Sequence, residues 1–96
     1  MNDKDPLAEI RQRIDEIDTA LQQLISERAQ CAARVAEIKQ QQGEDQHFYR
    51  PEREARVLRA VMERNQGPLE DDSIVRIFRE IMAACLRIIE AAGAQL

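Results

Sequence analysis

Apolar residues recur at alternating intervals of three and four along the first third of the chain. The positions are Leu7, Ile10, Ile14, Ile17, Leu21, Leu24, Cys31, Val35 and Ile38. This spacing is that of a heptad seam on one face of a helix. Asp5 is placed to cap such a helix, Pro6 suits its first turn, and neither Gly nor Pro follows until Gly43. The pattern predicts one helix over about residues 6–41, on the order of 50 Å long.

Two shorter apolar stripes follow. The first predicts a helix over about residues 51–65, with apolar positions Val57, Leu58, Val61 and Met62. The second comes after the turn GPLEDD and predicts a helix over about residues 71–92, with Asp71 or Asp72 as its N-cap. Its apolar positions are Ile74, Ile77, Phe78, Ile81, Met82, Cys85, Ile88 and Ile89.

The composition supports an all-α fold. Aromatic residues make up only 3% of the chain, and Ala, Glu, Arg, Leu, Ile and Gln dominate, so strand formers are scarce. Ninety-six residues suffice for one small domain, over residues 1–96. Cys31 and Cys85 fall inside apolar helical patterns, so we expect small core residues with reduced thiols.

Charge and hydropathy exclude some classes of partner. The net charge of −4 is unlike that of a nucleic-acid-binding domain. The N-terminal stretch MNDKDPLAEI is polar and acidic, unlike a signal peptide, and no apolar run approaches the ~20 residues of a membrane span. We therefore expect a cytoplasmic protein without nucleic-acid or membrane partners.

The length of the first helix predicts association. A compact chain of this size has a radius of gyration near 12–13 Å, so a helix of about 50 Å must protrude from it. Its apolar seam would then be exposed, which marks an association site. The simplest arrangement is a homodimer in which the long helices of two chains pack together, and small chains need such help to bury enough surface.

Three cations of the first helix are candidates for anion binding. Arg28 stands where the seam should be apolar, and Lys39 returns to within about 20° of the same face, about 16 Å along the axis. Arg11 lies about 25 Å from Arg28, too far to share its site, but it could reach the site of a partner in an antiparallel dimer. The alternative is that Arg28 sets the register by pairing with an acid such as Glu54, while Arg11 and Lys39 are surface cations.

The start of the second helix is unusually cationic. Arg50 precedes Pro51, and Arg53 and Glu54 follow in the first turn, one turn before apolar residues, so we expect both on the buried side. A helix N-terminus adds free N–H groups and partial positive charge. The arrangement suits an anion that carries a hydroxyl, with Glu54 as the acceptor. The alternative is a capping salt bridge.

The sequence contains no motif for metal binding, nucleophilic catalysis or phosphate binding. His47 stands alone, so no metal site is expected. There is no Ser-His-Asp or Cys-His arrangement and no glycine-rich phosphate loop. An enzyme of this sequence would therefore work by cationic preorganisation.

The joint pattern resembles the all-helical (AroQ-type) chorismate mutase family. The stretches FYRPEREARVL, GPL and FREIM look most like the mutase domain at the N-terminus of bifunctional chorismate mutase–prephenate dehydratases. The resemblance covers residues from about 5 to 90. It implies three helices per chain in an intertwined homodimer. It also implies rearrangement of chorismate to prephenate, on the route to phenylalanine and tyrosine, without a cofactor or a covalent intermediate.

The resemblance also implies roles for individual residues. Arg11 of the partner chain and Arg28 would hold the two substrate carboxylates. Lys39 would bond the ether oxygen and a carboxylate. Glu54 would take the ring hydroxyl, and Arg53 would support the pocket.

The match departs from the family on the last helix. The family places a Gln or Glu there as second donor to the ether oxygen, and that position here is Ile89. Glu90 is one residue later, about 100° around the helix, so it would serve only if a local distortion turned it inward. Cys85 stands where the family often has a small hydroxyl residue. Arg50 stands near the pocket, where acids also occur.

Two other readings stay open. An isochorismate-pyruvate lyase uses a similar cationic pocket. A weak or inactive helical dimer module would fit an apolar residue at Ile89. The pattern of these residues does not predict a fused dehydratase domain, a pH optimum or feedback control.

Overall fold

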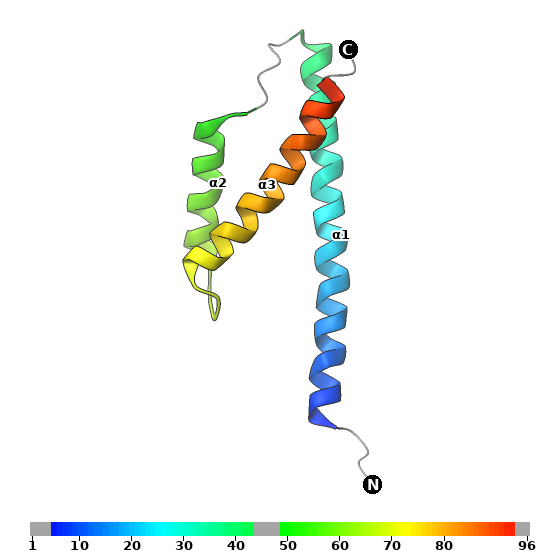
Figure 1. The fold of residues 1–96 in the computed structure, drawn as a ribbon, viewed down its shortest axis with the longest axis vertical. Coiled ribbons are helices and arrows are strands. Elements are labelled where there is room, and N and C mark those ends of the chain that lie inside the picture. Colours follow the sequence, from blue (N-terminus) through cyan, green and yellow to red (C-terminus); the bar gives the residue numbers. More distant parts are fainter. Residues whose placement is uncertain (1–4, 44–48, 94–96) are drawn as a thin grey trace.

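Three helices make up the regular structure of residues 5–43 and 49–93, the part that the computed structural model describes. Helix α1 spans Pro6–Gln41, α2 spans Pro51–Arg64 and α3 spans Asp71–Gly93. The predicted all-α fold with a very long first helix is confirmed, since α1 alone has 36 residues. The helices form an open, elongated arrangement of 66 × 26 × 15 Å (Figure 1).

Helix α1 begins and ends at the residues that local chemistry favours. The Asp5 carboxylate accepts a hydrogen bond from the backbone N–H of Leu7 at 3.1 Å, and Pro6 occupies the first helical position. At the other end, the N–H of Gly43 donates to the carbonyl of Gln40 at 3.1 Å. Gly43 has a φ of +65°, a left-handed conformation that only glycine adopts without steric cost.

The turn between α2 and α3 is organised by Asn65. Its side-chain amide donates to the carbonyl of Leu69 and to the carboxylate of Asp71, both at 2.8 Å, and its oxygen accepts from the N–H of Gly67 at 3.3 Å. Gly67 has a φ of +73°, so a side chain there would be strained. One side chain thus holds the end of α2 and the start of α3 together.

The predicted N-cap of α3 is wrong by one residue. The carbonyl of Glu70 accepts the first backbone bonds of the helix, from Ser73 at 3.0 Å and Ile74 at 3.2 Å. Glu70 is therefore the capping position, and Asp71 and Asp72 lie in the first turn. Acidic side chains are favoured there by the helix dipole, and Asn65 already uses the Asp71 carboxylate as an acceptor.

Helix α3 holds the chain together. It packs against both other helices, whereas α1 and α2 do not contact each other within the described residues. It runs diagonally from the end of α2 to the C-terminal part of α1 (Figure 1). The buried core is thin and consists of Ala32, Ala36, Leu58, Val61, Val75 and Cys85.

The N-terminal half of α1 has no neighbour in the described chain. Every residue from 5 to 27 is exposed, including seam residues such as Leu7 at 52% and Leu24 at 62%. The radius of gyration is 18.0 Å, against about 12–13 Å for a compact chain of this length. The predicted protrusion of the long helix is therefore present, and its apolar seam faces solvent. None of the helices in the described part of the chain is both long and apolar enough to cross a bilayer.

The two cysteines do not share one environment. Both are free; Cys85 is buried, as expected, but Cys31 is exposed. The expectation for Cys31 is wrong for the single chain because this residue belongs to the seam, whereas α3 covers a neighbouring face of α1.

We expect Asn65→Ala to lower the free energy of unfolding by about 1–2 kcal/mol, because three hydrogen bonds of modest net value are lost. Chemical denaturation by urea at matched protein concentration measures this. Gln66→Ala is the control, since Gln66 is the exposed neighbour in the same turn. Equal midpoints for the two variants would show that Asn65 does not stabilise the turn.

Candidate active site

One strip of α1 is shielded by the fold. Its members are the seven residues of the C-terminal half of α1 that are buried or half-buried. These are Arg28, Ala29, Ala32, Ala33, Ala36, Lys39 and Gln40. The strip lies about a third of a turn around the helix from the apolar seam. Four of the seven residues are alanines, and Ala36 is completely buried, so α3 can approach α1 closely.

Arg28 and Lys39 lie on the border between this strip and the seam. Both are half-buried, and a continuous helix separates them by about 16 Å along its axis. Within the described chain, no hydrogen bond or ion pair joins the Arg28 guanidinium to Glu54 or to another residue. A register-setting pair with an acid of a second chain stays a prediction. Lys39 is in the last turn of α1, where the helix dipole favours a cation.

The first turn of α2 separates its charged residues. Glu54 is half-buried, whereas Arg50 and Arg53 are exposed. The expectation that Arg53 faces the buried side is therefore wrong for the single chain. The cause is helical spacing: Glu54 lies one turn before the buried Leu58, while Arg53 is about 100° away at the edge of that face. Arg50 occupies the N-cap position without a side-chain cap, and its carbonyl accepts from the Glu54 N–H at 3.0 Å.

Helix α3 presents an apolar wall. Cys85 is buried, Ile89 is half-buried one turn later, and Glu90 is exposed. The helix continues without a break to Gly93, so no local distortion turns Glu90 inward. At the position where the resemblance predicts a second hydrogen-bond donor, the described chain has the aliphatic side chain of Ile89.

The C-terminal ends of α1 and α3 lie at the same end of the molecule as the start of α2 (Figure 1). The single chain does not close the site. One hollow of the described surface runs along the polar face of α1 from Thr19 to Gln30, and another lies between α2 and α3. Neither of them is lined by a predicted site residue.

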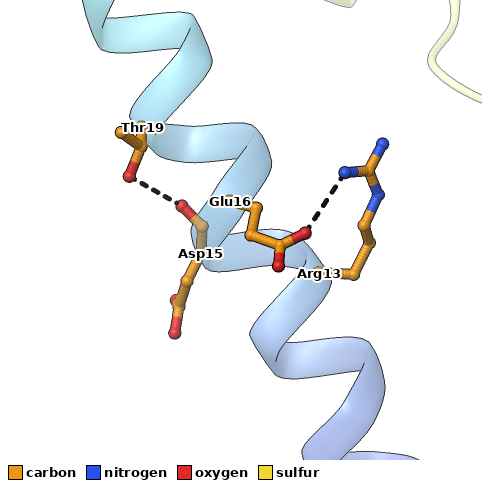
Figure 2. Close-up of polar contacts among 4 residues, drawn as sticks. All are labelled: Arg13, Asp15, Glu16 and Thr19. Atoms are coloured by element: carbon orange, nitrogen blue, oxygen red, sulfur yellow. Dashed lines mark hydrogen bonds and ion pairs between the residues drawn. The ribbon is translucent and has the colours of Figure 1, made fainter.

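Arg11 stays far from this end. It is exposed on the uncovered half of α1, about 25 Å from Arg28. Figure 2 shows polar contacts in the same half of α1: Arg13 pairs with Glu16 at 3.3 Å, and the Thr19 hydroxyl donates to the Asp15 carbonyl at 3.0 Å. Arg11 lies on the opposite side of the seam from Arg13 and has no such partner in the described chain.

The described residues contain no candidate metal site. Among residues 5–43 and 49–93 there is no group of three or more His, Cys, Asp or Glu side chains placed to hold a metal ion. His47 lies outside the described residues.

One polar contact at the site was missed by sequence reasoning. The Gln40 amide donates to the backbone carbonyl of Ala92 at 3.3 Å, joining the ends of α1 and α3. A signal was present, because Gln40 is four residues after Ala36 and eight after Ala32 and therefore continues the strip.

Comparisons with known proteins identify the family and the fold. The family model described as chorismate mutase type II matches residues 10–90. The bifunctional chorismate mutase/prephenate dehydratase of Pseudomonas aeruginosa is 52% identical over 91 residues, which cover 92% of this chain and 25% of that protein. The protein of the same description from Neisseria gonorrhoeae is 45% identical over 78 residues, 81% of this chain and 20% of that one.

A solved structure shows the same arrangement of helices. The chorismate mutase of Thermus thermophilus (form II) superposes with a TM-score of 0.83 at 27% identity, covering 90% of this chain and 96% of that one. By contrast, the chain spans about a quarter of the length of the curated relatives it matches. The family model covers most of the chain, and the chain belongs to the chorismate mutase type II family.

Proposed function

We propose that residues 1–96 act as one chorismate mutase domain, which rearranges chorismate to prephenate on the route to phenylalanine and tyrosine. The observation that carries this is Arg28, a half-buried guanidinium without a partner in the described chain. Holding such a charge away from water is costly unless an anion pairs with it. A substrate with two carboxylates supplies that anion, and the named relatives are described as mutases.

The chemistry needs few groups. The reaction is unimolecular, so the site must hold the reactive conformer and stabilise charge that develops on the ether oxygen. Arg28 binds one carboxylate, Lys39 reaches the ether oxygen and a carboxylate, and Glu54 accepts from the ring hydroxyl. Arg53 supports the pocket from its edge. No covalent intermediate, metal or cofactor enters this scheme.

Three further residues border the substrate. Arg50 adds positive charge at the start of α2. Cys85 and Ile89 form the apolar wall of α3. Glu90 is one residue after Ile89, about 100° around a helix that continues to Gly93, so in this proposal it takes no part in the reaction.

The working unit of this proposal is an antiparallel, intertwined homodimer. Support comes from the exposed seam of α1, whose burial against a second copy removes a large apolar surface from water. If Arg11 of one chain meets Arg28 of the other, the twofold axis passes midway between them, near Ala20. Residues 7–32 of the two helices then overlap over about 38 Å. The partner's α1 supplies a further wall of the site, and its Arg11 binds the second carboxylate.

Ile89 favours a second candidate, a weak or inactive mutase. A donor to a developing oxyanion is worth about 10²–10³ in rate, and an aliphatic side chain provides none. An isochorismate-pyruvate lyase would use the same cations. Supplying isochorismate and measuring salicylate and pyruvate distinguishes it.

Subunit exchange tests the dimeric site. We expect Arg11→Ala and Arg28→Ala each to lower kcat/KM for chorismate by about 10²–10³. In an equimolar mixture after exchange, half of the dimers are mixed, and each mixed dimer has one site with both arginines intact. The mixture should therefore recover about a quarter of wild-type activity. The measurement is loss of chorismate absorbance.

The matched control is a mixture of Arg28→Ala and Lys39→Ala. Both changes lie in the site of their own chain, so a mixed dimer has no intact site and no recovery is expected. Arg13→Ala controls for loss of a cation near Arg11. Absence of recovery in the first mixture, with mixed dimers demonstrated by native mass spectrometry, would contradict supply of Arg11 by the partner.

The apolar wall gives a gain-of-function prediction. Ile89→Gln adds a donor beside the ether oxygen and should raise kcat by about 10²-fold. Glu90→Ala should leave kcat within about twofold between pH 5.5 and 8, because Glu90 lies about 100° around the unbroken helix α3 from Ile89. Steady-state kinetics with chorismate measures both. An unchanged kcat in a folded Ile89→Gln dimer, together with a large loss in Glu90→Ala, would place Glu90 in the site instead.

A further inference from the structure

The hydrogen bond between Gln40 and Ala92 joins the two helix ends that form one side of the site. The donor is the side-chain amide, the acceptor is the backbone carbonyl, and their separation is 3.3 Å in a part-buried position. The two residues are 52 positions apart in the sequence. The contact is therefore tertiary and does not belong to either helix alone.

The Ala92 carbonyl needs a donor from outside its helix. Helix α3 ends at Gly93, and the last four carbonyls of any helix lack a partner within it. Helix α1 completes its own end locally, since the carbonyls of Ile38 and Gln40 accept from the N–H groups of Gln42 and Gly43. The Gln40 side chain is thus available to cap α3.

Both partners lie on the faces that carry the site. Gln40 follows Lys39 directly and continues the strip of Ala32 and Ala36. On α3, Ala92 is three residues after Ile89, on the same face and about 4.5 Å along the axis. The hydrogen bond therefore sets the distance between the end of α1 that carries Lys39 and the turn of α3 that carries Ile89.

We propose that Gln40 is a positioning residue of the mutase site. It touches no substrate atom; it keeps the last turn of α3 against α1, so that the wall around the ether oxygen stays in place. The alanine side chains of α1 are too small to interlock with α3 and prevent the two helices from sliding along each other. The last turn of a helix also frays when its carbonyls have no hydrogen-bond donor. Displacement of about 1 Å in a site can cost about 10²-fold in rate. This inference rests on the proposed mutase function.

Gln40→Met tests the hydrogen bond at nearly constant volume. The matched control is Gln41→Met, the same change at the exposed neighbour. We expect Gln40→Met to lower kcat about three- to tenfold, with KM changed by less than about twofold, because the arginines that bind the carboxylates are not on α3. The control should keep both constants. Equal kcat in the two variants would overturn the proposal.

Gln40→Glu makes the hydrogen bond depend on pH, which a role in packing alone would not do. An ionised carboxylate cannot donate to the Ala92 carbonyl, whereas a protonated one can. The ratio of kcat in Gln40→Glu to kcat in Gln40→Met should therefore rise as pH falls from 7.5 to 5, toward the ordinary Glu pKa of about 4.3. A flat ratio would contradict the hydrogen-bonding role.

Amide hydrogen exchange separates this inference from the mutase assignment. Exchange at residues 90–93 should be about three- to tenfold faster in Gln40→Met than in Gln41→Met, whether or not the wild-type dimer turns over chorismate. Gln40→Lys keeps a donor and should retain wild-type exchange and kcat. A loss in Gln40→Lys as large as in Gln40→Met, or equal exchange in all variants, would refute the positioning role.

Discussion

The close approach of α3 to the alanine strip of α1 is the contact on which the rest of the structure depends. Ala36 is completely buried and Ala32 nearly so, because small side chains let two helix backbones come together. Helix α3 is the only described helix that contacts α1, and α2 is attached through α3 alone. The position of α2 relative to α1 therefore depends on this packing together with the packing of α2 on α3.

That contact also determines where the charges of α1 lie. The strip covered by α3 is about a third of a turn from the seam, so Arg28 and Lys39 are left on the border between a covered face and an open one. A cation in such a place is shielded from part of its water but keeps room for a ligand. The apolar seam, by contrast, remains uncovered in the described chain, and the proposed homodimer would bury it.

The position of α3 makes its last turns chemically important. Cys85, Ile89 and Ala92 share the face toward α1, and the end of that face is held by Gln40. In the proposed mutase site, an aliphatic side chain at Ile89 supplies no hydrogen-bond donor, which would limit the electrostatic stabilisation of the transition state. In this proposal the rate depends strongly on how well the remaining cations are held.

Interactions between residues close in sequence allowed the helices of this protein to be predicted from its sequence. The Asp5 cap, Pro6, the heptad spacing and Gly43 define α1 by interactions within a few residues, and those depend little on the rest of the fold. Resemblance of Arg28, Lys39, Glu54 and their neighbours to a known pattern identified the family. The sequence also indicated that a helix of this length could not bury its own seam.

Tertiary structure alone decided which faces are covered. Periodicity shows that a stripe is apolar, but it does not say which helix packs on it; Cys31 was expected in the core and is exposed, because α3 covers alanines instead. Arg53 and Glu54 differ in burial through a rotation of about 100° against a helix distant in sequence. The contact of Gln40 with Ala92 likewise joins residues 52 positions apart, which no local pattern encodes, since their proximity exists only once α3 has packed on α1.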